Sequence, residues 1–343
     1  MKAAVIREFG DFDVLQLEEV PTPKPRPGHI LIKVLAAGIN RLEDYLREGS
    51  VVPELAFPHI LGADAAGEVA AFGEGVKGFQ IGERVVHQPG FPTDPAEYNI
   101  RPATTAASFT LPGLAIPGTY AQYVEIPAEF VLKDETGLSP EEVATLPMVL
   151  ATGVRAVKTV GGVKAGDKVL VQAGAGGAGS MQIQIAKALG AEVATTIRDA
   201  EKADVARKAG ADLIINTTEE DFVAKVQEWS NGGAHVVIDS LGGDVLAKSI
   251  DAARPLGTIV AFGFVAGTQT TFDMRNFFFT QKKLLGTMAG DIEDLKWGLA
   301  QVKEGYIKPM LDRALPLSQA GRAHRLLASS QVAGNIVLLP WAA

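Results

Sequence analysis

The sequence predicts an α/β protein that combines an antiparallel β domain with a doubly wound parallel sheet of six strands. Three observations lead to this prediction. Residues 1–125 carry short apolar stretches between glycine and proline turns, residues 165–287 alternate strand-like with helix-like stretches, and a glycine-rich loop follows the first strand of that second region. At 343 residues, the chain is long enough for about two domains.

The first region has the spacing of a compact antiparallel sheet. Its expected strands lie at residues 30–35, 65–71, 84–86 and 120–126. Four prolines and a glycine within residues 21–28 exclude regular structure there. The long, proline-rich stretch Gln88–Gly118 is predicted to be either a surface lobe or a flexible cover.

The second region alternates strands and helices in a way that implies a parallel sheet of two βαβαβ halves, the arrangement that binds dinucleotides. We expect strands at 168–172, 192–197, 212–215, 234–239, 258–262 and 283–287, and helices at 180–189, 200–209, 219–229 and 244–253.

The tail shows no third core. Helices are expected at 292–304 and 319–330, and a last strand at 335–339. We therefore predict that the tail packs on the N-terminal domain, which gives a domain of residues 1–125 completed by 290–343 and a dinucleotide-binding domain of residues 126–289.

Composition excludes several classes of function. The net charge of −8 without a basic cluster argues against nucleic-acid binding. No apolar run is long enough for a membrane span and the start lacks a signal-peptide core, which favours the cytoplasm. The absence of cysteine excludes disulfides, thiolate metal sites and a cysteine nucleophile. The chemistry must therefore come from other side chains or from a bound cofactor.

The glycine-rich loop is the strongest functional motif. Residues 174–179 read GAGGAG, follow the strand at 168–172 and open a helix, whereas a second match at residues 73–78 is followed by another turn. Gly174 should allow the tight exit from the strand, and Gly176 should let the backbone approach the pyrophosphate. Gly179 should allow close packing of helix and strand. Gly177 and Ala178 complete the loop at the helix N-terminus.

The end of the second strand predicts which nicotinamide cofactor binds. Ile197 stands at the tip and cannot accept a hydrogen bond, while Arg198 and Lys202 can neutralise a 2′-phosphate. Asp199 lies 20 residues after Gly179, the spacing of an acid that binds the ribose of NAD, but it can also cap the helix at 200–209. We favour the cap and NADPH.

A longer set of residues resembles a known family: Gly166-Asp167, Leu170, Gly174–Gly177, Gly179, Gln184 and Lys187, with Ala36–Asn40, Leu61–Gly67 and Val237–Gly242. These stretches are similar to the zinc-free quinone oxidoreductase (zeta-crystallin-like) group of the medium-chain dehydrogenase/reductase superfamily. The resemblance implies a GroES-like catalytic domain, completed by the C-terminal segment, around a Rossmann domain. The predicted cofactor-binding set further includes Ser240, Phe262 and Gly263.

The resemblance also places the zinc ligands of the metal-dependent relatives. By register they fall on Asn40, Ala63 and Met148, and a hydroxyl of the proton relay falls on Leu42. These residues do not offer the thiolate, imidazole or carboxylate donors that zinc takes, so we predict no metal. His59 and His87 are expected to be ordinary partly buried or surface histidines.

Without a Lewis acid, reduction of a quinone or an α,β-unsaturated carbonyl is the reaction that is easiest to run, because conjugation already activates the carbon that takes the hydride. Asn40 and Tyr45 could donate to the developing oxyanion, and Thr152 resembles the family threonine beside the nicotinamide. Each has a structural alternative: turn chemistry after Gly38 for Asn40, packing on a short helix at 42–47 for Tyr45, and a helix cap for Thr152.

Other functions remain open at this point. A zinc-free alcohol dehydrogenase-like enzyme or an enoyl reductase would use the same fold, and some relatives bind NADPH without turnover. The expected partner is a small-molecule quinone or enone, with no nucleic acid, and the resemblance implies a homodimer or homotetramer formed through sheet edges.

Overall fold

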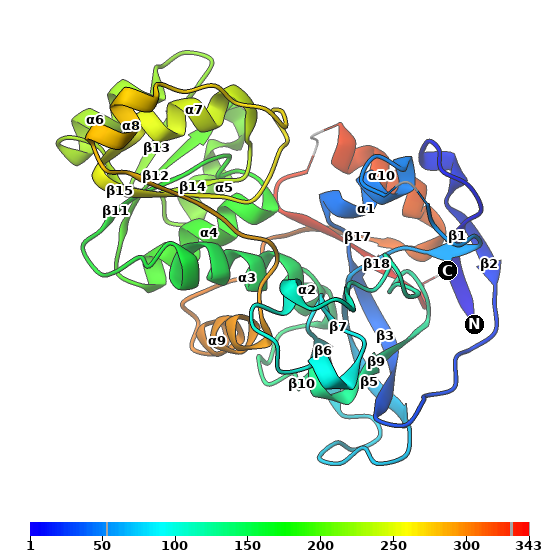
Figure 1. Cartoon of the computed structure of the whole chain (residues 1–343). Helices are drawn as coiled ribbons and strands as arrows, with labels where there is room; N and C mark the ends of the chain where they lie inside the picture. The colour runs from blue at the N-terminus through cyan, green and yellow to red at the C-terminus, as the bar shows by residue number, and fades with distance from the viewer. Residues whose placement is uncertain (53, 330–331, 343) are drawn as a thin grey trace. The chain divides into compact units, whose positions relative to one another are not determined.

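The computed structural model describes residues 1–52, 54–329 and 332–342 (Figure 1). The chain divides into two compact units: unit 1 comprises Met1–Ala151, Gly290–Lys303 and Pro309–Ala343, and unit 2 comprises Thr152–Ala289 and Glu304–Lys308. Residues 126–151, predicted to belong to the second domain, lie in unit 1, and residues 304–308 lie in unit 2. The shift at 126 arises because β10 (Val131–Lys133) pairs with β6 (Arg84–His87) of unit 1.

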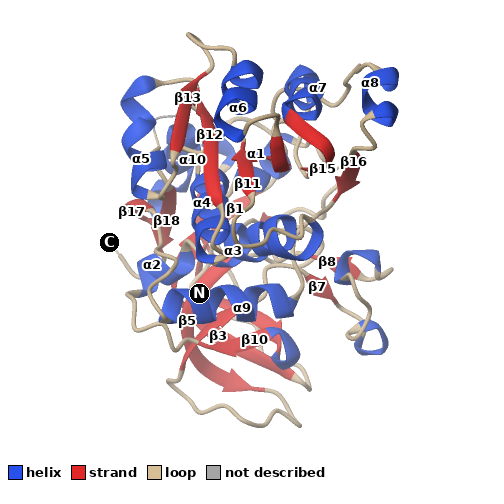
Figure 2. Ribbon diagram, turned by 90° about the vertical axis from the view of Figure 1, so that its left-hand side faces the viewer, coloured by secondary structure: helices blue, strands red, loops and turns tan. Residues whose placement is uncertain are grey.

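Unit 1 is built on a mostly antiparallel sheet in the order β10-β6-β5-β3-β18-β17, with β9 also paired to β3. Figure 2 shows these strands, drawn in red, together with the helices of the unit. The further strands are β3 (His29–Gly38), β5 (Asp64–Phe72), β9 (Tyr123–Pro127), β17 (Leu311–Pro316) and β18 (Asn335–Leu339). Alternating apolar residues of β3, among them Ile30, Ile32 and Val34, fill the core of this unit.

The predicted return of the tail is confirmed, since β18 pairs with β3 and β17 pairs with β18. The β17–β18 pair is parallel, an exception in a region predicted as antiparallel. A smaller sheet, β2-β1-β4, escaped prediction; its strands are β1 (Lys2–Ile6), β2 (Gln16–Glu19) and β4 (His59–Ile60). The helices of unit 1 are α1 (Arg41–Glu48), α2 (Pro140–Ala144), α9 (Ile292–Lys303) and α10 (Ala320–Ala328). The predicted end of the last helix at Ser330 lies outside the described residues.

The stretch Gln88–Gly118 has secondary structure of its own, which favours the predicted lobe over the flexible cover. It contains the strand pair β7 (Phe91–Pro92) and β8 (Phe109–Thr110), and Phe91 is buried and stacked on Phe130. Asp291 accepts a hydrogen bond from the Ala103 amide, which ties the lobe to the segment before α9.

Unit 2 contains the predicted parallel sheet, in the order β13-β12-β11-β14-β15-β16. This order is that of a six-stranded Rossmann sheet, with the switch of direction between the first and fourth strands of the unit. The strands are β11 (Lys168–Val171), β12 (Glu192–Ile197), β13 (Leu213–Asn216), β14 (Ala234–Asp239), β15 (Ala253–Ala261) and β16 (Lys283–Gly286).

Helices cover both faces of this sheet. α6 (Phe222–Ser230) contacts α7 (Gly243–Ala252), and α4 (Gly177–Ala188) contacts α5 (Ala203–Lys208), so each pair covers one face (Figure 1). The predicted helix at 200–209 is divided into a 3-10 turn (Ala200–Lys202) and α5. α8 (Met274–Phe279) precedes β16, and α3 (Pro147–Val154) continues into a π-helical segment (Arg155–Val160). Within the described residues no helix is long and apolar enough to cross a membrane.

Candidate functional site

Two carboxylates surround Asn40 in unit 1. Asn40 is the N-cap residue of α1 and is half-buried. Its backbone N–H donates to Glu43 Oε2 at 2.8 Å, and its Nδ2 donates to Asp64 Oδ2 at 3.0 Å. The other oxygen of Glu43 accepts from the Ala63 amide at 3.0 Å, and the other oxygen of Asp64 accepts from the Met148 amide at 3.0 Å. The structure therefore brings Asn40, Ala63 and Met148 together around two acids.

The two acids are deeply buried, each about 1% exposed. Burial, together with the neighbouring charge of Asp64, raises the pKa of Glu43 to about 8. Burial also raises the pKa of Asp64 to about 7, against the hydrogen bonds from Asn40 and Met148, which lower it. Two like charges this close titrate as a coupled pair, and together they hold a proton near neutral pH.

Zinc does not match the donors at this place. Asn40, Ala63 and Met148 offer an amide, a methyl group and a thioether, and the four oxygens of Glu43 and Asp64 already accept from N–H groups. Across the ranges that the structure describes, no group of three or more histidine and acidic side chains is arranged to hold a metal ion.

The two histidines near this region are both buried. His59 Nε2 lies 2.9 Å from the Gly113 carbonyl oxygen, and His87 Nδ1 lies 2.8 Å from that of Gln88. Burial lowers the pKa of both and brings that of His87 to about 4. They are ordinary buried histidines, neutral at physiological pH.

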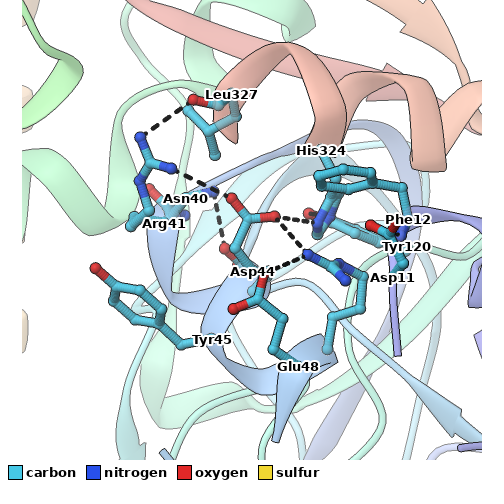
Figure 3. Close-up of polar contacts among 12 residues, drawn as sticks. Asp11, Phe12, Asn40, Arg41, Asp44, Tyr45, Glu48, Tyr120, His324 and Leu327 are labelled. Atoms are coloured by element: carbon cyan, nitrogen blue, oxygen red, sulfur yellow. Dashed lines mark hydrogen bonds and ion pairs between the residues drawn. The ribbon is translucent and has the colours of Figure 1, made fainter. Parts of the chain in front are cut away.

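Tyr45 lies on α1 and is half-buried, as the packing alternative requires. Figure 3 shows its hydroxyl turned away from the polar contacts made by Asp44 on the same helix. Asp44 Oδ1 lies 2.8 Å from His324 Nδ1 of α10, and His324 Nε2 lies 3.1 Å from the Tyr120 hydroxyl. Arg41 and Arg47 flank the same carboxylate at 3.6 and 3.7 Å. This network fixes α1, which carries Asn40 and Tyr45, to α10.

Thr152 belongs to unit 2 and lies inside α3. The helix-cap alternative is therefore wrong, because a cap residue stands at the end of a helix. Its place beside a nicotinamide stays a prediction.

The glycine loop of unit 2 has the geometry of a phosphate cradle. Gly176 is the N-cap residue of α4 and no side chain caps this end of the helix, so the first N–H groups are left to a ligand. A Cβ added at Gly179 would lie 2.2 Å from the Ala173 carbonyl oxygen, which confirms the close packing predicted there. A Cβ at Gly176 would meet nothing nearer than that oxygen at 3.6 Å, so the space in front of it is open. The residue in the left-handed conformation is Ala173, with φ of 56°, not Gly174.

The end of β12 lies in the predicted register. Ile197 is the last residue of the strand and is buried, and Arg198 follows as an exposed side chain. Asp199 caps the next turn by accepting from the Glu201 amide at 3.0 Å, which confirms the cap. Lys202 ends this turn and is half-buried.

The ends of β14 and β15 carry the remaining predicted cofactor residues. Ser240 follows β14, and Phe262 and Gly263 follow β15. The two ends meet closely, since a Cβ at Gly263 would lie 2.1 Å from the Ser240 carbonyl oxygen. They form one edge of the sheet at its carboxyl ends, where ligands of such sheets bind.

A buried polar chain connects these ends to the glycine loop. Its links are Asp239 Oδ2 to Ser249 Oγ at 2.6 Å, Ser249 Oγ to Gln172 Nε2 at 2.9 Å, Gln172 Oε1 to Thr196 Oγ1 at 2.6 Å, and Thr196 Oγ1 to the Ala173 amide at 3.1 Å. This series of hydrogen bonds ends on the backbone N–H of Ala173 and stabilises its left-handed conformation.

Sequence reasoning missed Glu43, Asp64 and the polar chain of unit 2. A signal for Glu43 was present, because Asn40 followed three residues later by glutamate is the pattern of a capping box. Asp64 begins a buried strand, where an unpaired carboxylate needs donors, but the sequence does not reveal that Asn40 and Met148 supply them.

Comparison with known proteins identifies the family of the chain. Residues 26–136 match the alcohol dehydrogenase GroES-like domain, and residues 177–304 match the zinc-binding dehydrogenase family. The 2-haloacrylate reductase of a Burkholderia species is 32% identical, over 99% of this chain and 99% of that protein. A probable quinone oxidoreductase of Schizosaccharomyces pombe is 31% identical, over 97% of this chain and 95% of that protein.

Solved structures show the same fold over nearly the whole chain. A crystal structure of an NAD-dependent alcohol dehydrogenase superposes with a TM-score of 0.92 at 33% identity, covering 99% of both chains. The crotonyl-CoA carboxylase/reductase AntE in complex with NADP superposes with a TM-score of 0.89 at 25% identity, covering 99% of this chain and 94% of the other.

The chain is an oxidoreductase of the medium-chain dehydrogenase/reductase superfamily. Within that superfamily it belongs to the quinone oxidoreductase-like group, as the motifs of the sequence indicate.

Proposed function

We propose that the protein is a cytoplasmic, NADPH-dependent reductase that transfers hydride to a quinone or an α,β-unsaturated carbonyl compound without zinc. The observation that carries this proposal is the place of Asn40. Where zinc-dependent relatives have their first ligand, this chain holds a half-buried amide anchored to a buried carboxylate. An amide N–H stabilises a developing oxyanion but does not act as a Lewis acid, which fits reduction of a conjugated acceptor.

The chain's own residues would supply positioning and hydrogen bonding. NADPH, when bound, supplies the hydride. Asn40 would donate to the acceptor oxygen on which negative charge develops, and the Tyr45 hydroxyl would donate to it or deliver the proton that completes the reduction. A quinone that takes a hydride and a proton becomes a hydroquinone, and an enone becomes the saturated carbonyl compound. The names of the two relatives, a haloacrylate reductase and a quinone oxidoreductase, support this substrate class.

The choice of NADPH rests on the end of β12. Arg198 is exposed beside Ile197, and Asp199 is engaged as a cap. This set suits a 2′-phosphate better than a free ribose hydroxyl. The NADP complex of AntE supports the proposal, while another neighbour is NAD-dependent, so a direct comparison of both cofactors is required.

A panel of acceptors tests the proposed function. With NADPH, small quinones and α,β-unsaturated carbonyl compounds should be reduced much faster than simple ketones, and turnover should survive a chelator. Elemental analysis should find far less than one zinc per chain.

Asn40→Ala and Tyr45→Phe should each lower kcat by about a hundredfold while NADPH affinity is retained. Fast oxidation of simple alcohols with no activity on quinones or enones would refute the proposal, and NADPH binding without any turnover would favour the non-enzymatic alternative.

We also propose that the protein forms a homodimer through the edge of the unit 2 sheet. β16 is the terminal strand of that sheet, and its Leu285 side chain is exposed. Large apolar side chains of the segments next to β16 in the sequence are exposed too: Phe279 of α8 is 70% exposed, and Met274, Phe278 and Met288 are also exposed. An open edge beside an apolar patch is complementary to a second copy of itself about a twofold axis.

A further inference from the structure

We propose that Asp64 is a positioning residue for the reaction, because it fixes the side-chain amide of Asn40 in the orientation in which its second N–H is free for the substrate oxygen. This inference rests on the proposed function. It adds a residue that makes no contact with substrate and acts through Asn40.

Asp64 accepts one hydrogen bond on each of its two carboxylate oxygens. One carboxylate oxygen accepts from Asn40 Nδ2 and the other from the Met148 amide, each at 3.0 Å. Of the two buried acids, Glu43 has the higher pKa and takes the proton that the pair holds, so Asp64 is the ionised partner. A carboxylate has only acceptors, so it binds the NH2 end of Asn40 and excludes the flipped amide, in which the carbonyl oxygen would face it. Asp64 therefore determines which end of the Asn40 amide is anchored.

The surroundings make this anchor rigid. Asp64 is the first residue of β5 and lies opposite Gly38 of β3 in the sheet register. A Cβ on Gly38 would lie 3.0 Å from the Asp64 Cβ and 2.3 Å from the Ala144 carbonyl oxygen, so the backbones of β3, β5 and α2 are closely packed here. The backbone of Asn40 is held independently by Glu43. The Asn40 side chain is thus fixed relative to two elements at once.

Asn40 and Asp64 differ in solvent exposure, and this difference separates a residue that can touch the substrate from one that can only position it. Asn40 is half-buried and accessible, whereas Asp64 is about 1% exposed and lies behind it. A substrate that touches Asn40 does not reach Asp64. Removal of the anchor would leave an amide that rotates, and misplacement of a hydrogen-bond donor by about 1 Å costs on the order of a hundredfold in rate.

The test is a double-mutant cycle with Asp64→Asn and Asn40→Ala. The asparagine has nearly the same shape but only one carbonyl oxygen, so it cannot accept from both Met148 and Asn40. We expect Asp64→Asn to lower kcat by about tenfold to a hundredfold with little change in NADPH affinity. In the double variant kcat should equal that of Asn40→Ala alone, because the anchor has nothing left to position. The matched control is Asp134→Asn, since the Asp134 side chain is only 2% exposed and its two oxygens bind Thr136 and Arg84.

Two further readouts separate this inference from a structural effect and from the proposed function. The side-chain NH2 resonances of Asn40 in isotope-edited NMR, assigned by their loss in Asn40→Ala, should shift in Asp64→Asn and stay in place in Asp134→Asn. An active wild type whose kcat is unchanged in Asp64→Asn, or multiplicative losses in the double variant, would overturn the inference alone. A wild type that binds NADPH and reduces no acceptor would overturn the proposed function and this inference with it.

Discussion

At the scale of single residues, the proposed preference for NADPH depends on Arg198. It is exposed directly after the last residue of β12, where the 2′ position of a bound dinucleotide is recognised in this fold. A charge-assisted hydrogen bond is worth about 1.5–3 kcal/mol, so Arg198→Ala should weaken NADPH binding by about tenfold to a hundredfold and leave NADH binding nearly unchanged. Titration calorimetry with both cofactors measures this. Arg207→Ala, an exposed arginine of α5 paired with Asp204, is the control. Equal loss for both cofactors would contradict the assignment.

The buried acids around Asn40 predict a pH dependence of stability. An unfolded glutamate titrates near ~4.3, whereas burial raises the pKa of Glu43 in the folded protein to about 8. Between these values the folded state binds more protons than the unfolded state, so the free energy of unfolding decreases as pH rises from about 4 to about 8. Asp64, with its pKa raised to about 7, contributes in the same direction.

Glu43→Gln should therefore flatten the loss of thermal stability between about pH 5 and pH 9. Its stability at low pH should fall below that of the wild type, because the glutamine NH2 group cannot accept from the N–H group of Asn40 or Ala63, whereas the hydroxyl oxygen of a protonated glutamate still can. Melting temperatures across the pH range measure both effects. Glu74→Gln, on an exposed turn, should leave the profile unchanged. A wild-type stability that increases over this range would show that Glu43 is ionised in the folded protein.

At the scale of elements, two variants of the glycine loop should distinguish effects on folding from effects on cofactor binding. Gly176→Ala places its Cβ in open space, with no atom nearer than 3.6 Å, so the variant should fold with nearly the melting temperature of the wild type. The same methyl group would occupy the space where the pyrophosphate approaches, and NADPH affinity should fall by at least tenfold. Gly179→Ala puts a Cβ 2.2 Å from the Ala173 carbonyl oxygen and should lower stability as well. Melting temperature and NADPH titration distinguish the two variants. An unchanged NADPH affinity in Gly176→Ala would exclude this loop as the phosphate site.

The contact between α1 and α10 predicts a large effect on stability. His324 is fully buried between Asp44 and Tyr120 (Figure 3). Removal of one partner of a buried polar pair leaves the other desolvated, so His324→Leu should cost about 3 kcal/mol in the free energy of unfolding. Tyr120→Phe removes only a hydroxyl and should cost about 1 kcal/mol. Denaturant titration measures both values. Similar small losses in the two variants would mean that Arg41 and Arg47 alone stabilise Asp44.

At the scale of the whole molecule, the open sheet edge predicts the oligomeric state. Light scattering after size-exclusion chromatography should give about twice the chain mass of 36.1 kDa. Leu285→Lys should produce monomers, because a lysine on an edge strand opposes pairing with a second strand. Ile81→Lys changes an apolar residue of unit 1 that is even more exposed than Leu285, and it should leave the dimer intact. A monomeric wild type would refute the dimer.

Local signals were enough to predict unit 2. The strands at 192–197 and 234–239 have the predicted bounds, because strand–helix alternation and glycine stops act over short distances. Unit 1 was less predictable. β1, β2 and β17 were not predicted, and residues 126–151 were assigned to the second domain although they lie in unit 1. Both differences arise because these segments are held by pairing with strands that are distant in the sequence. The same holds for the site: Asn40 and Tyr45 were named from sequence, but Asp64 acquires its role only through contacts with residues 24 and 84 positions away.

Unit 1 is made of three separate stretches of the chain, and this division affects the order in which the two units can fold. Unit 2 is complete once residue 308 has been synthesised, whereas the sheet of unit 1 waits for β18, whose Val337 pairs with Gly38 of β3. Domains fold as units during synthesis, and pairing of strands so far apart in the chain is slow. We therefore expect the nucleotide-binding unit in the middle of the sequence to fold first during synthesis. Unit 1, although it begins earlier, closes last, so its apolar strand faces and unpaired strand edges should stay exposed for longer during synthesis.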